Sequence, residues 1–303
     1  MRFEPIVHAQ DPRIADYRNV RERDLLERQR VLLAEGTVVV RVLLRQGRYR
    51  IRSLLLEERR VDMLAADLAL LPSDVPIYVA PQRVFDAIVG LPMHRGVLAA
   101  ADVGEPVDPG LLLSGPGPST VLVLEGINNH DNVGGIFRNA KAFGVDAVLL
   151  DQSTCSPLYR KAIRVSVGAT LLVPFARVEG GILGRLRASG YTTMALTPAV
   201  DALDLRGIRE VPERLAVLVG AEGDGLRRET LEGAELRVRI AMAPGFDSLN
   251  VATAAGIALF ALSGASKQRP GLSAPQPSGP ALQIVEAVQV SQGREQPRPD
   301  SDH

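Results

Sequence analysis

Short apolar runs separated by polar segments recur along the chain after residue 118. They are TVLVLE (120–125), VDAVLLD (145–151), TLLVPFA (170–176), YTTMALT (191–197), LAVLVG (215–220) and RVRIAM (237–242). Uninterrupted apolar runs of this length are typical of strands in a parallel sheet that is covered on both faces. The stretches between them suit helices and turns, so we predict an α/β domain over residues 119–265.

Before residue 103, some segments have the apolar spacing of helices and others have that of strands. RERDLLERQRVLL (21–33) has helical spacing, whereas TVVVRVLL (37–44) fits either a helix or a strand. The segments that follow read as strand YRIRSLLLEE (49–58), helix VDMLAADLALL (61–71), strand PIYVA (76–80), helix QRVFDAIV (82–89) and the apolar run GVLAAAD (96–102). This predicts a small α/β domain within residues 1–107, followed by a linker rich in Gly and Pro at 108–118.

Composition narrows the class of protein. Apolar residues make up 46% of the chain and charged residues 23%, which is ordinary for a globular protein. We find no membrane-length apolar run, no signal peptide and a single cysteine, Cys155, and therefore expect a cytoplasmic protein. Pro, Gln, Ser and Gly dominate after residue 265, which predicts a disordered tail at 266–303.

The net charge is zero, but residues 41–60 hold seven arginines and two glutamates, a local balance of 7 − 2 = +5. Such a cluster can bind a phosphate backbone, because counterion release depends on local contacts. An ordinary solvated surface is the alternative. Arg160, Lys161 and Arg164 share one helical face and are candidates to extend an RNA path.

Three polar segments follow apolar strands. In the first, NNHDNVGGIFRNAKAFG (128–144), we predict that Asn132 caps a helix that runs to Phe143. Arg138 lies roughly 200° around that helix from Ile136 and is free to face a ligand. Gly134 and Gly135 would let another group, such as an anion, approach the start of the helix. The plainer alternative is a simple cap and a surface arginine.

The second polar segment is LVGAEGDGL (218–226) and the third is IAMAPGFDSLNVATAAGIALFAL (240–262). In the third, Ser248 is a candidate cap for a helix whose small residues, among them Ala252 and Gly256, permit close packing. Open α/β sheets bind ligands where strands end, so three such segments predict one shared site. The chain has no G-x-x-x-x-G-K-[ST], no zinc-ligand spacing and no G-x-S-x-G, and we expect no metal.

These segments resemble, in order, motifs 1, 2 and 3 of the SpoU (TrmH) class of S-adenosylmethionine-dependent RNA 2′-O-ribose methyltransferases, in the SPOUT superfamily. The resemblance covers about 119–263. Residues 20–103 resemble, more loosely, the family's N-terminal substrate-binding domain, a ribosomal-protein-like α/β/α module. The resemblance implies a parallel sheet tied into a deep trefoil knot and a homodimer with the cofactor site near its interface.

The resemblance also implies roles for individual residues. The catalytic or substrate-positioning residues would be Asn132, Arg138, Glu222, Ser248 and Asn250, and the cofactor would lie against Leu196, Thr197, Gly220, Ile240, Met242 and Leu249. One departure is Ala241, where many relatives have proline. Arg138 would grip an RNA phosphate and stabilise the developing alkoxide. A role as general base is the alternative, although a guanidinium rarely loses its proton.

The function expected from the resemblance is methylation of a ribose 2′-hydroxyl in RNA. The additional N-terminal domain favours rRNA over tRNA, because it resembles modules that dock on folded RNA by shape. Two alternatives stay open, a tRNA 2′-O-methyltransferase and an inactive RNA-binding module of the same fold.

Overall fold

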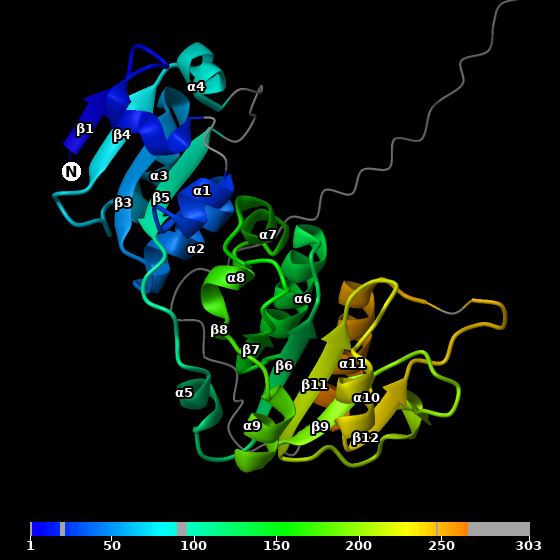
Figure 1. The fold of residues 1–303 in the computed structure, drawn as a ribbon. Helices are drawn as coiled ribbons and strands as arrows, with labels where there is room; N and C mark the ends of the chain where they lie inside the picture. Colours follow the sequence, from blue (N-terminus) through cyan, green and yellow to red (C-terminus); the bar gives the residue numbers. More distant parts are fainter. Residues whose placement is uncertain (1, 19–21, 90–95, 247, 266–303) are drawn as a thin grey trace, which may run out of the picture. The chain divides into compact units, whose positions relative to one another are not determined.

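The computed structural model describes residues 2–18, 22–89, 96–246 and 248–265. The expected disordered tail, 266–303, lies outside the described residues. The strands form a five-stranded sheet near the N-terminus and a seven-stranded sheet after residue 118 (Figure 1). No described helix is both long enough and apolar enough to span a membrane.

The first sheet has the strand order β1-β4-β3-β5-β2. Its strands are β1 (Arg2–Pro5), β2 (Val31–Glu35), β3 (Ile51–Glu57), β4 (Pro76–Ala80) and β5 (Val97–Asp102). β5 is antiparallel to both of its neighbours, and the other pairs are parallel. The helices are α1 (Glu22–Glu27), α2 (Thr37–Gln46), α3 (Val61–Leu68), α4 (Gln82–Val89) and the 3₁₀ turns Pro12–Tyr17 and Glu58–Arg60. Apolar clusters lie on both faces, so this sheet is a buried central layer.

The second sheet has the order β10-β12-β9-β11-β6-β7-β8, and every pair in it is parallel. Its strands are β6 (Ser119–Glu125), β7 (Ala147–Leu150), β8 (Phe175–Arg177), β9 (Thr192–Leu196), β10 (Leu203–Asp204), β11 (Arg214–Gly220) and β12 (Leu236–Arg239). The helices are α5 (Pro109–Leu113), α6 (His130–Ala142), α7 (Arg160–Val165), α8 (Ala169–Leu172), α9 (Ile182–Ala188), α10 (Arg228–Gly233), α11 (Val251–Ala265) and the 3₁₀ turn Leu205–Gly207. The predicted α/β fold with a parallel sheet is confirmed.

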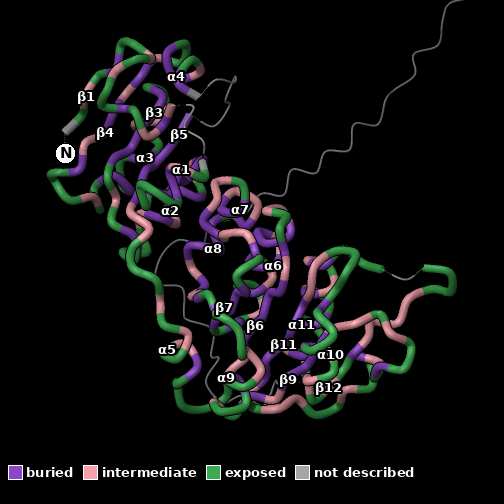
Figure 2. The backbone as a smooth tube through the Cα atoms, viewed as in Figure 1, coloured by how far each residue is buried: buried purple, intermediate pink, exposed green. Residues whose placement is uncertain are grey.

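Alternate side chains of the central strands pack into two different cores. Leu122 and Leu124 of β6 join a cluster with α6 and α11, whereas Val121 and Val123 join a cluster with α5 and α9. Figure 2 shows these strands as buried segments. Burial on both faces explains why the runs are apolar without alternation.

Two sequence-based element assignments were wrong. The expected helix over 21–33 ends at Glu27, and β2 begins at Val31, because Arg30 adopts a left-handed backbone conformation with φ of 55°. The run TLLVPFA contains α8 and then β8, with an extended Val173 before Pro174. A short apolar run does not by itself distinguish a buried helical turn from a strand.

The first sheet packs against α7 and α8, which follow β7 in the chain. Leu158, Ile163 and Leu171, around α7 and α8, belong to the same apolar cluster as α2 and α3. The buried carboxylate of Glu35, at the end of β2, lies 3.4 Å from Arg160 and 3.7 Å from Arg164. The predicted linker 108–118 is also partly ordered, because it contains α5 with its buried Leu113.

Candidate functional site

A cavity of about 170 Å³ lies where β9, β11 and β12 end and α11 begins. All six residues expected to contact a cofactor line it, namely Leu196, Thr197, Gly220, Ile240, Met242 and Leu249. Glu222 and Ser248, expected on catalytic grounds, line it as well. Segments as far apart in sequence as 196 and 254 therefore share one pocket, which includes the second and third predicted polar segments but no residue of the first, 128–144.

The turn after β11 gives the cavity one of its walls. Ala221 and Gly225 exchange main-chain hydrogen bonds of 3.2 and 3.1 Å, which close a tight loop around Glu222. Gly223 and Gly225 have φ values of 87° and 71°, which favour glycine. A Cβ on Gly220 would overlap the main chain of Gly225, so glycine is required there by close approach as well. The fold of this turn thus places the exposed Glu222 carboxylate at the cavity.

Three polar side chains, one from each motif, form a chain of hydrogen bonds beside the cavity. Asn250 Nδ2 donates to Asn132 Oδ1 at 2.8 Å and to Glu222 Oε1 at 3.0 Å. Asn132 is buried, whereas the other two are exposed. Asn250 therefore links a helix on one side of the site to the glycine-rich turn on the other.

The two predicted helix caps were wrong. Helix α6 begins at His130, and its cap is Asn129, whose side chain accepts from the Asp131 N–H at 2.8 Å. Asn132 lies inside the helix, where Asn250 satisfies its side-chain oxygen. At α11 the cap is Asn250 in place of Ser248, because Asn250 Oδ1 accepts from the N–H groups of Ala252 at 3.0 Å and Thr253 at 3.2 Å. Asn132 and Asn250 can therefore form the hydrogen bond that joins α6 to the start of α11.

The two glycines of motif 1 permit close packing within the chain. A Cβ on Gly134 would lie 2.8 Å from the main-chain oxygen of Ala162, and one on Gly135 would lie 2.9 Å from the Cβ of Ala252. The groups that approach these glycines are thus α7 and α11, while Gly135 also borders the open depression beside Arg138, so anion binding there stays a prediction. The small residues of α11 do pack closely, since Gly256 lies against Asn139 of α6.

Arg138 is exposed, as its place on the helix predicted, but it does not line the 170 Å³ cavity. It borders a separate open depression with Asn139, Thr253 and Phe260. We find no hydrogen bond or ion pair of its guanidinium to the residues that the structure describes. The structure thus groups four of the five predicted catalytic residues and leaves Arg138 beside them with its charge available.

The other predicted cations have partners within the chain. Lys161 lies 2.5 Å from Asp131, and Arg160 and Arg164 lie near Glu35. In the Arg41–Arg60 cluster, ion pairs join Arg41 and Arg45 to Asp67, Arg52 to Asp102, and Arg59 and Arg60 to Glu57. The excess positive charge of this region is consequently smaller than the count over 41–60 indicates.

Cys155 is half-buried, and burial raises the pKa of its thiol to about 11. The thiol is therefore neutral near pH 7. Sequence reasoning missed a polar group at the ends of β6 and β7, formed by Glu125, Asp151 and Arg227. A signal was available, because two successive apolar runs, TVLVLE and VDAVLLD, end in an acidic residue.

Comparisons with known proteins agree with this geometry. The model of the SpoU rRNA Methylase family matches residues 119–260. An uncharacterized tRNA/rRNA methyltransferase of Mycobacterium tuberculosis is 43% identical over 258 residues, which cover 82% of this chain and 88% of that protein. The 23S rRNA (guanosine-2′-O-)-methyltransferase RlmB of Pseudomonas syringae is 32% identical over 237 residues, 74% of this chain and 92% of that protein.

The fold is also similar to that of a solved structure. The crystal structure of an AdoMet-bound rRNA methyltransferase from Sinorhizobium meliloti matches with a TM-score of 0.70 at 24% identity. The match covers 86% of this chain and 97% of that one, so it includes both sheets.

Proposed function

We propose that this chain, which belongs to the SpoU rRNA Methylase family and is a methyltransferase, transfers the methyl group of S-adenosylmethionine to a ribose 2′-hydroxyl of rRNA. The observation that carries the proposal is the shared cavity, in which all six expected cofactor residues meet Glu222 and Ser248. A cavity with mainly apolar walls and a few polar groups is typical of a cofactor site.

The residues present fit S-adenosylmethionine. Leu196, Ile240 and Leu249 offer apolar walls, and the missing Cβ of Gly220 lets the main chain of Gly225 pack against it, which holds the turn that forms another wall. When bound, the cofactor supplies an activated methyl group on a positively charged sulfur. The protein then has to hold the ribose oxygen within about 3 to 3.5 Å of that methyl and to manage one proton.

The polar side chains divide this work. The hydrogen-bond chain of Glu222, Asn250 and Asn132 can orient the ribose, and Ser248 adds a hydroxyl at the cavity.

Arg138 has no partner among the described residues, so its guanidinium is available to bind an RNA phosphate and to stabilise developing negative charge. We expect Arg138→Ala to bind S-adenosylmethionine normally in calorimetry and to lose most methylation. Methylation by Arg138→Ala at the wild-type rate, or a loss of methylation explained by lost cofactor binding, would contradict this role.

The active form is proposed to be a cytoplasmic homodimer. Helix α11 is apolar on nearly all sides, and Ile257 and Phe260 remain exposed at 39% and 69%. A helix that is apolar all round is normally buried. Because this stripe adjoins the depression that Arg138 borders, a second copy packed on it would bring the arginine to the edge of the interface.

Transfer of labelled methyl groups from S-adenosylmethionine tests the proposal. Purified wild-type protein is incubated separately with ribosomal RNA and transfer RNA that lack the modification, and nuclease digestion with mass spectrometry identifies the modified nucleoside. We expect 2′-O-methylation of ribosomal RNA. Label in transfer RNA would support the alternative substrate, and RNA binding without label in either RNA would support an inactive binding module.

A further inference from the structure

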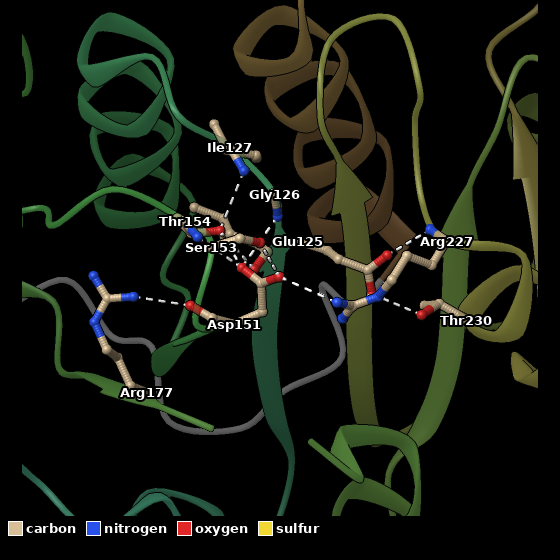
Figure 3. Close-up of polar contacts among 10 residues, drawn as sticks. Glu125, Gly126, Ile127, Asp151, Ser153, Thr154, Arg177, Arg227 and Thr230 are labelled. Atoms are coloured by element: carbon tan, nitrogen blue, oxygen red, sulfur yellow. Dashed lines mark hydrogen bonds and ion pairs between the residues drawn. The ribbon is translucent and has the colours of Figure 1, made fainter. Parts of the chain in front are cut away.

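Two carboxylates are buried at the ends of the neighbouring strands β6 and β7, beside β11. Glu125 ends β6 and Asp151 follows the neighbouring β7, and only 3% and 7% of these residues are exposed. The guanidinium of Arg227 reaches both, with Nη2 at 3.0 Å from Glu125 Oε2 and Nη1 at 3.5 Å from Asp151 Oδ2 (Figure 3). Two buried like charges are costly unless a cation compensates them, and the planar fork of arginine suits two carboxylates.

Asp151 organises the turn that leads into motif 1. Its Oδ1 accepts from the N–H of Gly126 at 3.1 Å and from the N–H and hydroxyl of Thr154 at 2.8 and 2.7 Å. The Thr154 hydroxyl oxygen in turn accepts from the N–H of Ile127 at 3.2 Å. Burial alone would raise the pKa of Asp151, but the hydrogen bonds from Ser153, Thr154 and Gly126 together lower it. Asp151 is thus a charged anchor for the segment just before α6, the helix that carries Asn132.

Glu125 organises the segment that follows motif 2. It accepts hydrogen bonds from the main-chain N–H of Arg227 and, at 2.7 Å, from the hydroxyl of Thr230 in α10. Arg227 comes directly after the glycine-rich turn, whose last residue is Leu226. Glu125 therefore fixes the end of the turn that presents Glu222.

We infer that Arg227 is a positioning residue for methyl transfer, which sets the spacing between the motif 1 helix and the motif 2 turn by joining the Glu125 and Asp151 anchors. The inference rests on the proposed function. Asn250 bridges the same two elements on the cavity side, from Asn132 to Glu222, so that bridge requires a constant separation. Arg227 does not line the cavity and contacts the reacting groups only through these elements.

The test compares Arg227→Gln with Arg228→Gln. Arg228 is the adjacent arginine, 88% exposed at its side chain and paired with Glu232 on the surface of α10, so its variant is a matched control. For Arg227→Gln we expect kcat for RNA methylation to fall by about 10²-fold, since small misplacements of reacting groups have effects of this size. The Kd for S-adenosylmethionine should change by less than about threefold, because the Ala221–Gly225 hydrogen bonds still shape the cavity wall. Arg228→Gln should match wild type in both quantities.

Chemical rescue separates positioning from a general loss of structure. The Arg227 side chain is 59% exposed, so methylguanidine can enter the space left in Arg227→Gly. We expect added methylguanidine to restore kcat at least about fivefold in that variant and to leave wild type unchanged. Equal kcat for Arg227→Gln and wild type, measured below the melting temperatures of both proteins, would overturn the inference. A fall in kcat that matches the fraction of unfolded Arg227→Gln would also overturn it. A wild-type protein that methylates no RNA would instead overturn the proposed function.

Discussion

Replacement of Asn250 tests the hydrogen-bond chain most directly, because two substitutions separate its two roles. Asn250 Oδ1 caps α11, and its Nδ2 joins Asn132 to Glu222. Asn250→Ala removes both functions. The lost cap costs about 1 kcal/mol of unfolding free energy. The side-chain oxygen of the buried Asn132 loses its donor, at about 1 to 3 kcal/mol. We therefore expect Asn250→Ala to be destabilised by about 2 to 4 kcal/mol in total.

Asn250→Asp keeps an acceptor for the α11 cap but replaces the donor by a negative charge. The new carboxylate would face Glu222, whose oxygen now lies 3.0 Å from Nδ2. As in Asn250→Ala, the side-chain oxygen of Asn132 loses its donor, at about 1 to 3 kcal/mol. Repulsion in this exposed position costs about 1 kcal/mol more, whereas the helix cap is kept and a negative charge at the helix start returns about 0.3 to 1 kcal/mol. We expect Asn250→Asp to be more stable than Asn250→Ala and yet to lose about 10²-fold in kcat.

Urea unfolding and initial rates of methyl transfer at saturating substrates measure the two effects. Asn129→Asp is the matched control, because it makes the same chemical change at the exposed cap of α6 and leaves the chain of Asn132, Asn250 and Glu222 intact. We expect its kcat to stay near that of wild type. Wild-type turnover in Asn250→Asp would refute the assignment of Asn250 as the link between the motifs.

Three further changes test the cavity, the dimer and the cysteine. Gly220→Ala should abolish S-adenosylmethionine binding in calorimetry, because the new Cβ overlaps the main chain of Gly225, and wild-type affinity would contradict the cavity assignment. Phe260→Asp should convert the proposed homodimer to a monomer in light scattering, whereas Val200→Asp, at a side chain 89% exposed in the native chain, should leave it dimeric; a dimeric Phe260→Asp would show that this face of α11 is not the interface. Because burial raises the pKa of Cys155 to about 11, its thiol should react with iodoacetamide at pH 8 more slowly than free cysteine, as followed by intact mass; an equal rate would contradict its burial.

The sequence predicted the location of the site better than the detail of its contacts. The polar segments after β11 and β12 meet at one cavity because parallel strands end at one edge of a sheet, so Gly220 and Ile240 could be grouped in advance. Leu196 was expected there only from the resemblance to a known family. The resemblance to a known family supplied their expected roles, and the trefoil knot that it implies stays a prediction.

Cap assignments failed for a physical reason. More than one asparagine or serine lies near each helix start, namely Asn128, Asn129 and Asn132 at α6 and Ser248 and Asn250 at α11, and propensity does not decide which one reaches the free N–H groups. Asn129 and Asn250 are the two caps. The side-chain oxygen of Asn132 therefore accepts a hydrogen bond from Asn250, and Ser248 lines the cavity. The role of Gly135 was likewise decided by a partner 117 residues away, Ala252, which local sequence does not reveal.

The packing of α7 and α8 against the first sheet has a consequence for how the molecule unfolds. Leu158, Ile163 and Leu171 complete an apolar core that begins in α2, and Glu35 is neutralised by arginines from α7. A chain shortened to start at the linker would expose those three side chains to water and leave both arginines without their acid. The described residues should therefore melt in one calorimetric transition, with the two sheets losing their order together.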